Sequence, residues 1–374
     1  MDVLLGFGGN AGQYPLLMSA GEFLSRRDFL KLSGATLLGL LFSDIALHPV
    51  FAAAPSQQGR VVYPHLLIRD APSFQGNKVG DYPRDTLLTI LDQVEGGVDS
   101  DYNRLWYQIG AQRYVYSGGV QPVKTVINEV VTDLPDTGVV GELTVPYADS
   151  SWDVNSHPVP GPRLYYATAH WIKGLVVDRR DGSLWYQAYD QLYQAYYYLR
   201  PQGVHILSQE ELSPLSPEVP ADEKHITILL DRQVLLAYEG DRMVYYARAA
   251  TGQPGFETPT GFFRTFHKRP TAHMVGGADE FSMFDLPAIP WDSYVTDSGV
   301  AIHGTYWHND FGHPHSHGCI NLSPQDAKWI YRWTQPGVPP GVRLVYEPGS
   351  GTSVQILKTA PVHPAGQRDS ALTG

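Results

Sequence analysis

Cysteine occurs once in the 374 residues of this chain, at Cys319, and this single thiol limits how the chain can fold. One cysteine cannot form an internal disulfide, so no disulfide framework stabilises the protein. Hydrophobic residues make up 43% of the sequence and charged residues only 17%, which is typical of globular proteins. We therefore expect domains held by packed cores, and the length has room for two or three of them.

The residues around Cys319 are of the types that make a thiol reactive. It lies in the run Ser316-His317-Gly318-Cys319-Ile320-Asn321, sixteen residues after His303. A neighbouring imidazole can take the thiol proton and stabilise the reactive thiolate as an ion pair. Glycine beside the cysteine lets a substrate backbone approach and frees main-chain N–H groups to face one point. The pattern indicates a cysteine acyl-transfer site.

Three runs in this region resemble the L,D-transpeptidase (YkuD-like) catalytic domain. They are Ile302-His303-Gly304-Thr305, the run from Ser316 to Asn321, and Leu322 to Ala327. The resemblance covers roughly residues 223–347, although the spacer between His303 and Ser316 is somewhat shorter than usual for the family. It implies that Cys319 is the nucleophile and that His303 is the proton acceptor. A main-chain carbonyl near Gly304 would orient the His303 ring.

The same resemblance implies roles for the residues around the nucleophile. The main-chain N–H groups of His317, Gly318 and Cys319 would stabilise the oxyanion of the tetrahedral intermediate. The segment from His273 to Tyr294 would form a flap that excludes water, although an ordinary surface hairpin fits the same residues. Asn321 and Ser316 could equally be scaffolding that pins the loop. The side chains expected at the substrate are Met274, Trp291, Tyr294, Ser316 and Asn321.

Two other interpretations fit parts of this region. A free cysteine is often buried in a core, but Cys319 follows a Pro-His-Ser-His-Gly loop and not an apolar run. Five histidines crowd residues 303–317, and histidine with cysteine suits zinc. No pair of cysteines has zinc spacing, so we predict no metal and no cofactor. The histidines outside the family motif are predicted to be exposed loop residues; these are His308, His313 and His315.

Residues 1–54 resemble a twin-arginine export signal. The run from Ser25 to Lys31 contains Arg26-Arg27 followed by Phe29-Leu30, and an interrupted apolar stretch and three alanines come after it. The apolar stretch is too short to predict a transmembrane span. We therefore expect export by the twin-arginine route and a location outside the cytoplasm, at the cell wall.

The middle of the chain reads as short strands punctuated by turns, similar to bacterial SH3-like domains. Leu184-Trp185-Tyr186-Gln187 repeats Leu105-Trp106-Tyr107-Gln108 at an offset of 79 residues, which indicates a duplicated module. We expect one SH3-like barrel over residues 60–135 and a second over residues 136–210. The predicted fold is mainly β: these two barrels, then a β-rich catalytic domain with a short helix.

The remaining boundaries follow from composition and pattern. Residues 211–222 contain spaced prolines and are expected to form an exposed linker before a catalytic domain over residues 223–348. That domain should contain a hairpin around Asp231-Arg232, a turn and strand from Thr258 to Phe263 that match the family, and a helix from Asp326 to Trp333. Residues 349–374 are polar and are expected to be frayed.

The resemblance implies peptidoglycan L,D-transpeptidation. A donor tetrapeptide would acylate Cys319, and an acceptor stem peptide would then form a 3→3 cross-link; carbapenems would inhibit the enzyme. The SH3-like modules would hold the enzyme on the cell wall. An L,D-carboxypeptidase, a transpeptidase that anchors wall proteins and a non-catalytic wall-binding protein remain alternatives. The net charge of −11 makes nucleic acid and anionic membranes poor partners.

Overall fold

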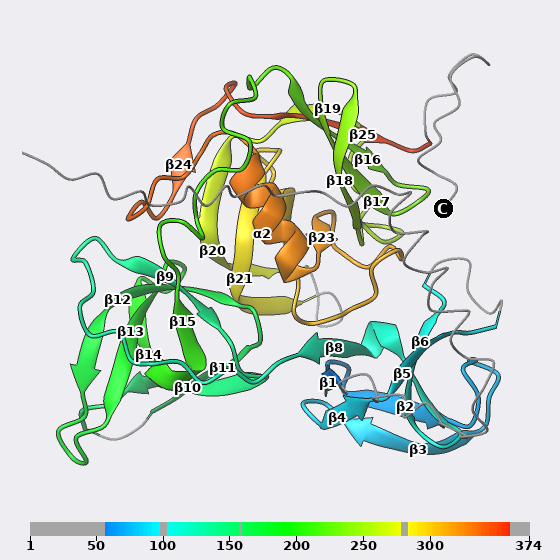
Figure 1. The fold of residues 1–374 in the computed structure, drawn as a ribbon, viewed down its shortest axis with the longest axis horizontal. Helices are drawn as coiled ribbons and strands as arrows, with labels where there is room; N and C mark the ends of the chain where they lie inside the picture. The colour runs from blue at the N-terminus through cyan, green and yellow to red at the C-terminus, as the bar shows by residue number, and fades with distance from the viewer. Residues whose placement is uncertain (1–56, 98–102, 157–158, 278–282, 360–374) are drawn as a thin grey trace, which may run out of the picture. The chain divides into compact units, whose positions relative to one another are not determined.

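The computed structural model describes residues 57–97, 103–156, 159–277 and 283–359, and the fold is mainly β, as predicted (Figure 1). All of these residues belong to one compact unit, residues 55–374. The predicted export signal, residues 1–54, lies outside the described residues. Within the described ranges, no helix has both the length and the apolar character needed to cross a membrane.

The first module, residues 57–123, consists of two small sheets with strand orders β4-β1-β8 and β3-β2-β7-β6-β5. Alternate residues of β2 and β4 are buried, so one face of each strand packs into a common core with Val115. The strands are β1 (Gln57–Val61), β2 (His65–Arg69), β3 (Lys78–Pro83), β4 (Leu87–Ile90), β5 (Asp92–Glu95), β6 (Leu105–Gly110), β7 (Arg113–Tyr116) and β8 (Val120–Val123).

The second module, residues 139–206, is a seven-stranded sheet in the order β11-β10-β14-β13-β12-β9-β15. Its core contains Tyr186 and Leu199, both without solvent exposure. The strands are β9 (Val139–Leu143), β10 (Tyr147–Asp153), β11 (Val159–Tyr165), β12 (Ala169–Val177), β13 (Leu184–Asp190), β14 (Ala195–Leu199) and β15 (Val204–Ile206).

The repeated Leu-Trp-Tyr-Gln run occupies equivalent places in the two modules. It begins β6 in the first and β13 in the second, and each strand pairs with the tyrosine-rich strand that follows. The turns contain Gln112 and Gln194, both with φ of 52°. A single 3₁₀ turn (η1, Ser117–Gly119; η2, Pro201–Gly203) and a short strand come next in each module. This shared order of elements supports the duplication inferred from the sequence.

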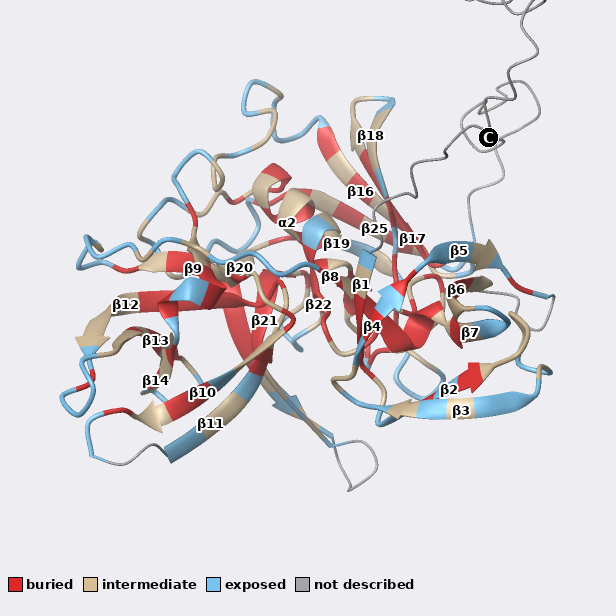
Figure 2. Cartoon of the chain, turned by 60° about the horizontal axis from the view of Figure 1, so that its bottom comes forward, coloured by how far each residue is buried: buried red, intermediate tan, exposed pale blue. Residues whose placement is uncertain are grey.

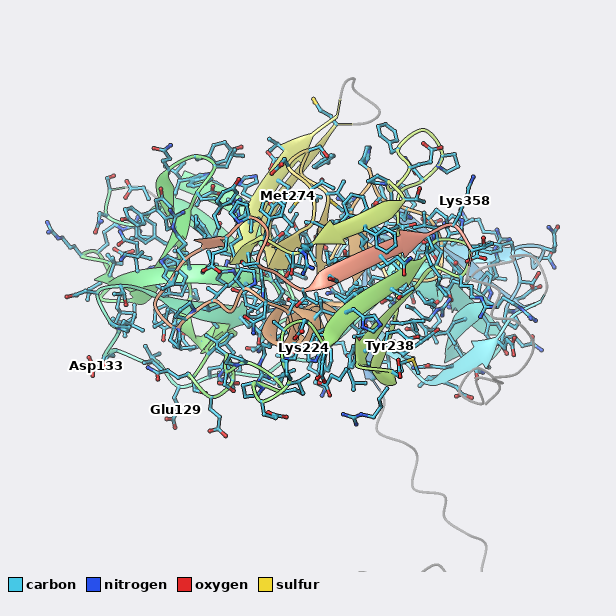
Figure 3. The ribbon with its side chains drawn as sticks, turned by 90° about the horizontal axis from the view of Figure 1, so that it is seen from above. Glu129, Asp133, Lys224, Tyr238, Met274 and Lys358 are labelled. Carbon is cyan, nitrogen blue, oxygen red and sulfur yellow. The ribbon has the colours of Figure 1, made fainter. Side chains whose placement is uncertain are left out.

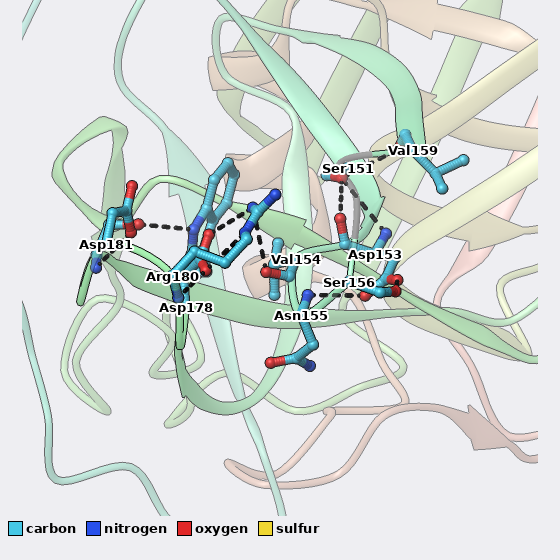
Figure 4. Close-up of polar contacts among 11 residues, drawn as sticks. Ser151, Asp153, Val154, Asn155, Ser156, Val159, Asp178, Arg180 and Asp181 are labelled. Carbon is cyan, nitrogen blue, oxygen red and sulfur yellow. Dashed lines mark hydrogen bonds and ion pairs between the residues drawn. The ribbon is translucent and has the colours of Figure 1, made fainter.

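Polar contacts join two loops at one end of the second module (Figure 4). The Arg180 guanidinium donates to both carboxylate oxygens of Asp178, at 3.0 and 2.6 Å, and also to the Val154 carbonyl at 3.3 Å. The Asp153 carboxylate accepts from the Asn155 N–H at 2.8 Å and closes its own loop. These bonds stabilise loops that have few apolar residues of their own.

The C-terminal region, residues 224–357, contains two five-stranded sheets, β18-β17-β16-β25-β19 and β23-β22-β21-β20-β24. Both sheets and helix α2 (Pro324–Trp333) contribute to one core, and the buried residues concentrate there in Figure 2. The strands are β16 (Lys224–Leu229), β17 (Val234–Glu239), β18 (Arg242–Arg248), β19 (Gly261–Arg264), β20 (His267–Gly276), β21 (Phe284–Tyr294), β22 (Ala301–Gly304), β23 (Ile320–Leu322), β24 (Val345–Tyr346) and β25 (Ser353–Leu357).

Helix α2 has polar partners at both ends. Ser323 is its N-cap, and the Ser323 hydroxyl accepts from the Asp326 N–H at 3.1 Å. At the other end, Lys268 Nζ donates to two main-chain carbonyls at 2.6 and 2.7 Å. Lys224, labelled in Figure 3, donates through Nζ to a third at 3.3 Å. The last carbonyls of a helix have no partner within it, so these Nζ donors fix the helix against the sheets.

Two sequence expectations for this region need correction. Residues 349–374 were expected to be frayed, but β25 lies inside a sheet, parallel to β16 and antiparallel to β19. Residues 211–222 were expected to be an exposed linker, but Leu212 and Leu215 pack against the core of the C-terminal region. Apolar side chains in an otherwise polar segment explain both differences. The predicted hairpin around Asp231-Arg232 is confirmed by β16 and β17.

Candidate active site

Two parallel strands place the predicted nucleophile and base on one surface. Strands β22 and β23 pair in parallel with His303 opposite Asn321, and Cys319 immediately precedes β23. His303 and Cys319 both line a cavity of about 220 Å³. We define the nucleophile loop as residues 316–319. The wall also contains Met274, Ser316 and His317 of the nucleophile loop, and Asn321 of β23, all of them predicted site residues.

His303 is buried and has one defined tautomer. Its Nδ1 lies 3.0 Å from the Gly304 carbonyl, which can only accept, so Nδ1 carries the proton. Nε2 therefore keeps its lone pair, as a general base requires. Burial lowers the pKa of His303 to about 4, against the opposing effect of the hydrogen bond to Gly304. The ring is neutral at neutral pH.

The Cys319 thiol is also neutral in this structure. The residue is partly exposed, and Sγ lies 3.7 Å from the Gly299 carbonyl. Burial raises the pKa of Cys319 to about 11, although the Ala301 N–H favours the thiolate. The expected thiolate–imidazolium pair is therefore not the resting state. Neither group is ionised at neutral pH in this structure.

Internal hydrogen bonds set the shape of the nucleophile loop. Gly318 has φ of +115°, a conformation that favours glycine. Its N–H donates to Ser316 Oγ at 3.1 Å, and the Ser316 hydroxyl donates to the Cys319 carbonyl at 2.6 Å. Ser316 therefore acts as scaffold. The expectation that the Gly318 N–H faces the oxyanion is wrong here, because Ser316 occupies it; the N–H groups of His317 and Cys319 remain candidates.

His308 was predicted to be exposed, but it is 1% exposed and supports Asn321. Its Nδ1 accepts from the Asp310 N–H at 3.1 Å, so Nε2 carries the proton of the neutral ring. Nε2 lies 3.0 Å from the Asn321 side-chain amide, a contact that needs the amide oxygen on that side. Hydrogen-bond partners on both nitrogens explain why this histidine is buried. His313 and His315 are partly exposed.

Strands β20 and β21 supply the apolar wall of the cavity. Met274 lies on β20 (Figure 3), and Phe284 and Leu286 lie on β21. Two residues predicted at the substrate are not in this wall. Trp291 is 1% exposed and packs on Tyr331, with ring centroids 5.2 Å apart.

Tyr294 stacks on His267 at 4.7 Å. Strand β21 is irregular here: Ala288 and Trp291 have positive φ angles of 57° and 67°, and burial does not alternate from Ala288 to Ser293.

Several residues of the site were not predicted. Thr258 belongs to the family-like turn, and its hydroxyl donates to the Gly318 carbonyl at 2.8 Å. Phe256 and Phe284 flank the His317 ring at 4.4 and 5.2 Å. Asp292 is fully buried, and burial raises its pKa well above the usual value. The turn at Thr258 was a usable signal, whereas the aromatic contacts depend on chain segments far apart in sequence.

A second cleft of about 400 Å³ adjoins this cavity, and Leu286 and Trp307 line both. Its walls come from all three parts of the described chain and carry aromatic rings and arginines. Among them are Arg60, Arg84, Trp152, Arg163, Tyr193 and His273. The buried Arg60 guanidinium also donates to the Tyr306 carbonyl at 2.6 Å, which fixes the segment that follows His303.

A family model and the curated relatives of this chain both carry the description L,D-transpeptidase. Residues 223–356 match the family model described as the L,D-transpeptidase catalytic domain (YkuD). L,D-transpeptidase 1 of Mycobacterium tuberculosis is 35% identical over 94 residues, which cover 22% of this chain and 36% of that protein. The chain thus spans about a third of the length of the curated relatives it matches.

Solved structures of L,D-transpeptidases are also similar to this chain. One from Mycobacterium smegmatis has 20% identity and a TM-score of 0.31, covering 63% of this chain and 100% of that one. The catalytic domain from E. faecium, solved acylated by ertapenem, has 23% identity and a TM-score of 0.29, covering 36% and 98%. The similarity to L,D-transpeptidase (YkuD) catalytic domains thus lies in residues 223–356.

Proposed function

We propose that the C-terminal region catalyses peptidoglycan L,D-transpeptidation through an acyl-enzyme on Cys319. The observation that carries this proposal is the pairing of a neutral His303, with Nε2 unprotonated, and the Cys319 thiol in one cavity wall. A thiol of raised pKa reacts when a base removes its proton during attack.

The reaction has two half-steps that use the same pair. In the first, Sγ attacks the carbonyl at the L-centre of the diamino acid in a donor tetrapeptide, and His303 Nε2 takes the thiol proton. The carbon–nitrogen bond to the terminal D-Ala breaks, and D-Ala leaves with that proton. In the second, the side-chain amine of an acceptor stem attacks the thioester. Its proton passes through His303 to the departing sulfur, which regenerates the thiol.

The apolar cavity wall supports transfer over hydrolysis in this proposal. Met274, Phe284 and Leu286 present apolar groups beside the thiol. A thioester partitions between attack by an amine and attack by water, so an apolar wall favours the amine. The second cleft shares Leu286 and Trp307 with the cavity, and it offers the acceptor stem a separate approach.

Inhibition by carbapenems is part of the proposal. The E. faecium catalytic domain was solved acylated by ertapenem. A β-lactam carbonyl would meet the same thiol and base as the donor peptide. Incubation with ertapenem should therefore add one drug mass to the intact protein and none to the Cys319→Ala variant.

Mass spectrometry of products from a disaccharide-tetrapeptide tests the main proposal. We expect a cross-linked dimer and free D-Ala from the unmodified protein, and neither from Cys319→Ala. A trimmed monomer without dimer would favour the L,D-carboxypeptidase alternative, and a dimer joined to a protein amine would favour wall-protein anchoring. Dimer formation by Cys319→Ala would contradict the assignment of the nucleophile. No product at all from the unmodified protein would favour the non-catalytic alternative.

A further inference from the structure

Three side chains that commonly bind metals meet just before the nucleophile loop. Asp310, His313 and His315 each offer one ligand atom, and these atoms all lie within 4.8 Å of one another. Their spacing, Asp-x-x-His-x-His, places them in the segment that connects β22 to β23. Cys319 is not among them, so this group differs from the cysteine–histidine zinc site considered from the sequence.

The Asp310 carboxylate is already oriented by the first module. The Tyr116 hydroxyl donates to its Oδ1 at 2.5 Å, and the Asn103 amide donates to the same oxygen at 3.2 Å. Oδ2 faces His313 instead, 3.9 Å from its Nδ1. That distance is too long for a hydrogen bond, and a small rotation of the partly exposed His313 ring would bring it to the ~3.3 Å between two ligands of a tetrahedral ion with bonds of about 2.0 Å. Outer partners that fix a ligand in this way are a regular feature of metal sites.

The surroundings of Asp310 favour a cation. Its carboxylate is buried, with 6% of the residue exposed, and no lysine or arginine among the described residues forms an ion pair with it. Buried charges in proteins are normally paired or bound to metals. The His313 side chain is 41% exposed, so an ion can reach the group from solvent. Two imidazoles and one carboxylate with an open fourth position suit Zn²⁺ and similar ions.

We propose that Asp310, His313 and His315 bind a divalent transition metal of the zinc class. Bound metal would connect the first module, through the partners of Asp310, to the catalytic cavity, through His315 in its wall. The ion would then hold the segment that leads into the nucleophile loop. The site rests on its own ligands and does not depend on the proposed transpeptidation.

Metal binding can be measured on the full-length protein without an affinity tag. We would titrate Zn²⁺ by calorimetry and record the visible absorption of Co²⁺ as a probe of tetrahedral histidine ligation. Both measurements use the parent protein and Cys319→Ser, which removes the thiol as a competing ligand. We expect one saturable site in each. Since outer partners alone are worth about 10–100-fold in affinity, His313→Ala and His315→Ala should each cost at least that much.

Matched variants separate this site from surface binding. His65 Nδ1 lies 3.8 Å from an Asp81 carboxylate oxygen, a similar pair but exposed and without a third ligand, so His65→Ala should leave Zn²⁺ affinity unchanged. Tyr116→Phe should weaken binding by about 10-fold through Asp310. Asp310→Asn should abolish it, and if that variant does not fold, His313→Ala decides because its side chain is partly exposed.

Three results would overturn the proposal. They are the absence of saturable binding in the parent, unchanged affinity in a folded His313→Ala variant, and loss of binding in Cys319→Ser.

Discussion

Two buried histidines of the C-terminal region, His273 on β20 and His303 on β22, have opposite pKa shifts. His303 donates to one carbonyl, and burial lowers its pKa to about 4. Burial also acts against the charge of His273, but its two nitrogens contact Asp190 and Asp285 at 2.6 Å each, and these bonds raise its pKa. Hydrogen-bond partners, and not burial alone, therefore set the direction in which each histidine pKa is shifted.

The difference matches two roles. The neutral His303 can act as a base, whereas His273, whose pKa is raised by its two carboxylate partners, joins Asp190 of the second module to the β20–β21 hairpin. The two pKa shifts also change the stability of the fold in different pH ranges, one below and one above the unfolded pKa of about 6.5. His303 lowers the free energy of unfolding as the pH falls from 6.5 towards 4, because in this range only the unfolded state binds a proton on that ring. The contribution of His273 is complete below its unfolded pKa and is lost as pH rises through its folded pKa.

Removing the base should have the largest effect. We expect His303→Ala to lower kcat for dimer formation by about 10²–10⁴-fold, because proton transfer from the thiol loses its acceptor. His273→Ala is the matched control, and we expect a much smaller change in kcat because this ring holds two carboxylates and not the thiol. Equal losses of kcat in the two folded variants would remove the distinction between the histidines.

Removing the buried partner of His273 should cost the most stability. The side chains of Asp190 and His273 are 3% and 4% exposed, and breaking such a pair typically costs about 3–5 kcal/mol. We therefore expect Asp190→Ala to lower the free energy of unfolding by about 3 kcal/mol, measured with urea below pH 6.5, since Asp285 still contacts the ring. Asp149→Ala, which removes an exposed carboxylate of the same module, should cost far less. A similar loss in both variants would mean that the buried Asp190–His273 pair stabilises the fold no more than an exposed carboxylate does.

The pH profile of the reaction should report the lowered pKa of His303. The acid limb of kcat/KM should fall near pH 4, because activity needs the neutral ring and the thiol titrates only near 11. An unperturbed histidine would place this limb at about 6.5. Circular dichroism at each pH keeps loss of fold separate from loss of base. An acid limb near 6.5 in folded protein would show that the ring is not desolvated during turnover.

The smallest effect should come from the exposed partner of His273. The Asp285 side chain is 61% exposed, so water screens its contact with the ring. We expect Asp285→Asn to lower the free energy of unfolding by about 1 kcal/mol or less. Urea unfolding of this variant beside Asp190→Ala gives the comparison directly. A cost as large as that of Asp190→Ala would indicate that the ion pair depends on both carboxylates equally.

The sequence predicted the class of fold, and it singled out His303 and Cys319, which line one cavity in the structure, because both have local signals. The hairpin around Asp231-Arg232 and the helix near Asp326 follow from periodicity and turn residues, although the helix begins two residues earlier, at Pro324. His303 and Cys319 stand in recognisable runs. Their meeting depends on parallel pairing of β22 and β23, which no spacing in the sequence specifies.

The failures have physical causes that act over long distances or in the backbone. His308 looks like an exposed loop residue until its bonds to Asp310 and Asn321 are seen. Trp291 looks like a flap residue, but it has a positive φ and its side chain lies in the core. Glycine at 318 suggested a free N–H, and only the three-dimensional loop shows that Ser316 accepts from it. In each case a specific hydrogen bond or dihedral angle overrides the local pattern.

The position of β25 has a consequence for biosynthesis. This strand fills the place between β16 and β19, yet it is the last strand in chain order among the described residues. Strand β19 pairs only with β25 in this sheet, so it has no strand partner there until residues 353–357 have been made. A copy that stops before residue 353 would therefore leave β19 separate from β16, β17 and β18.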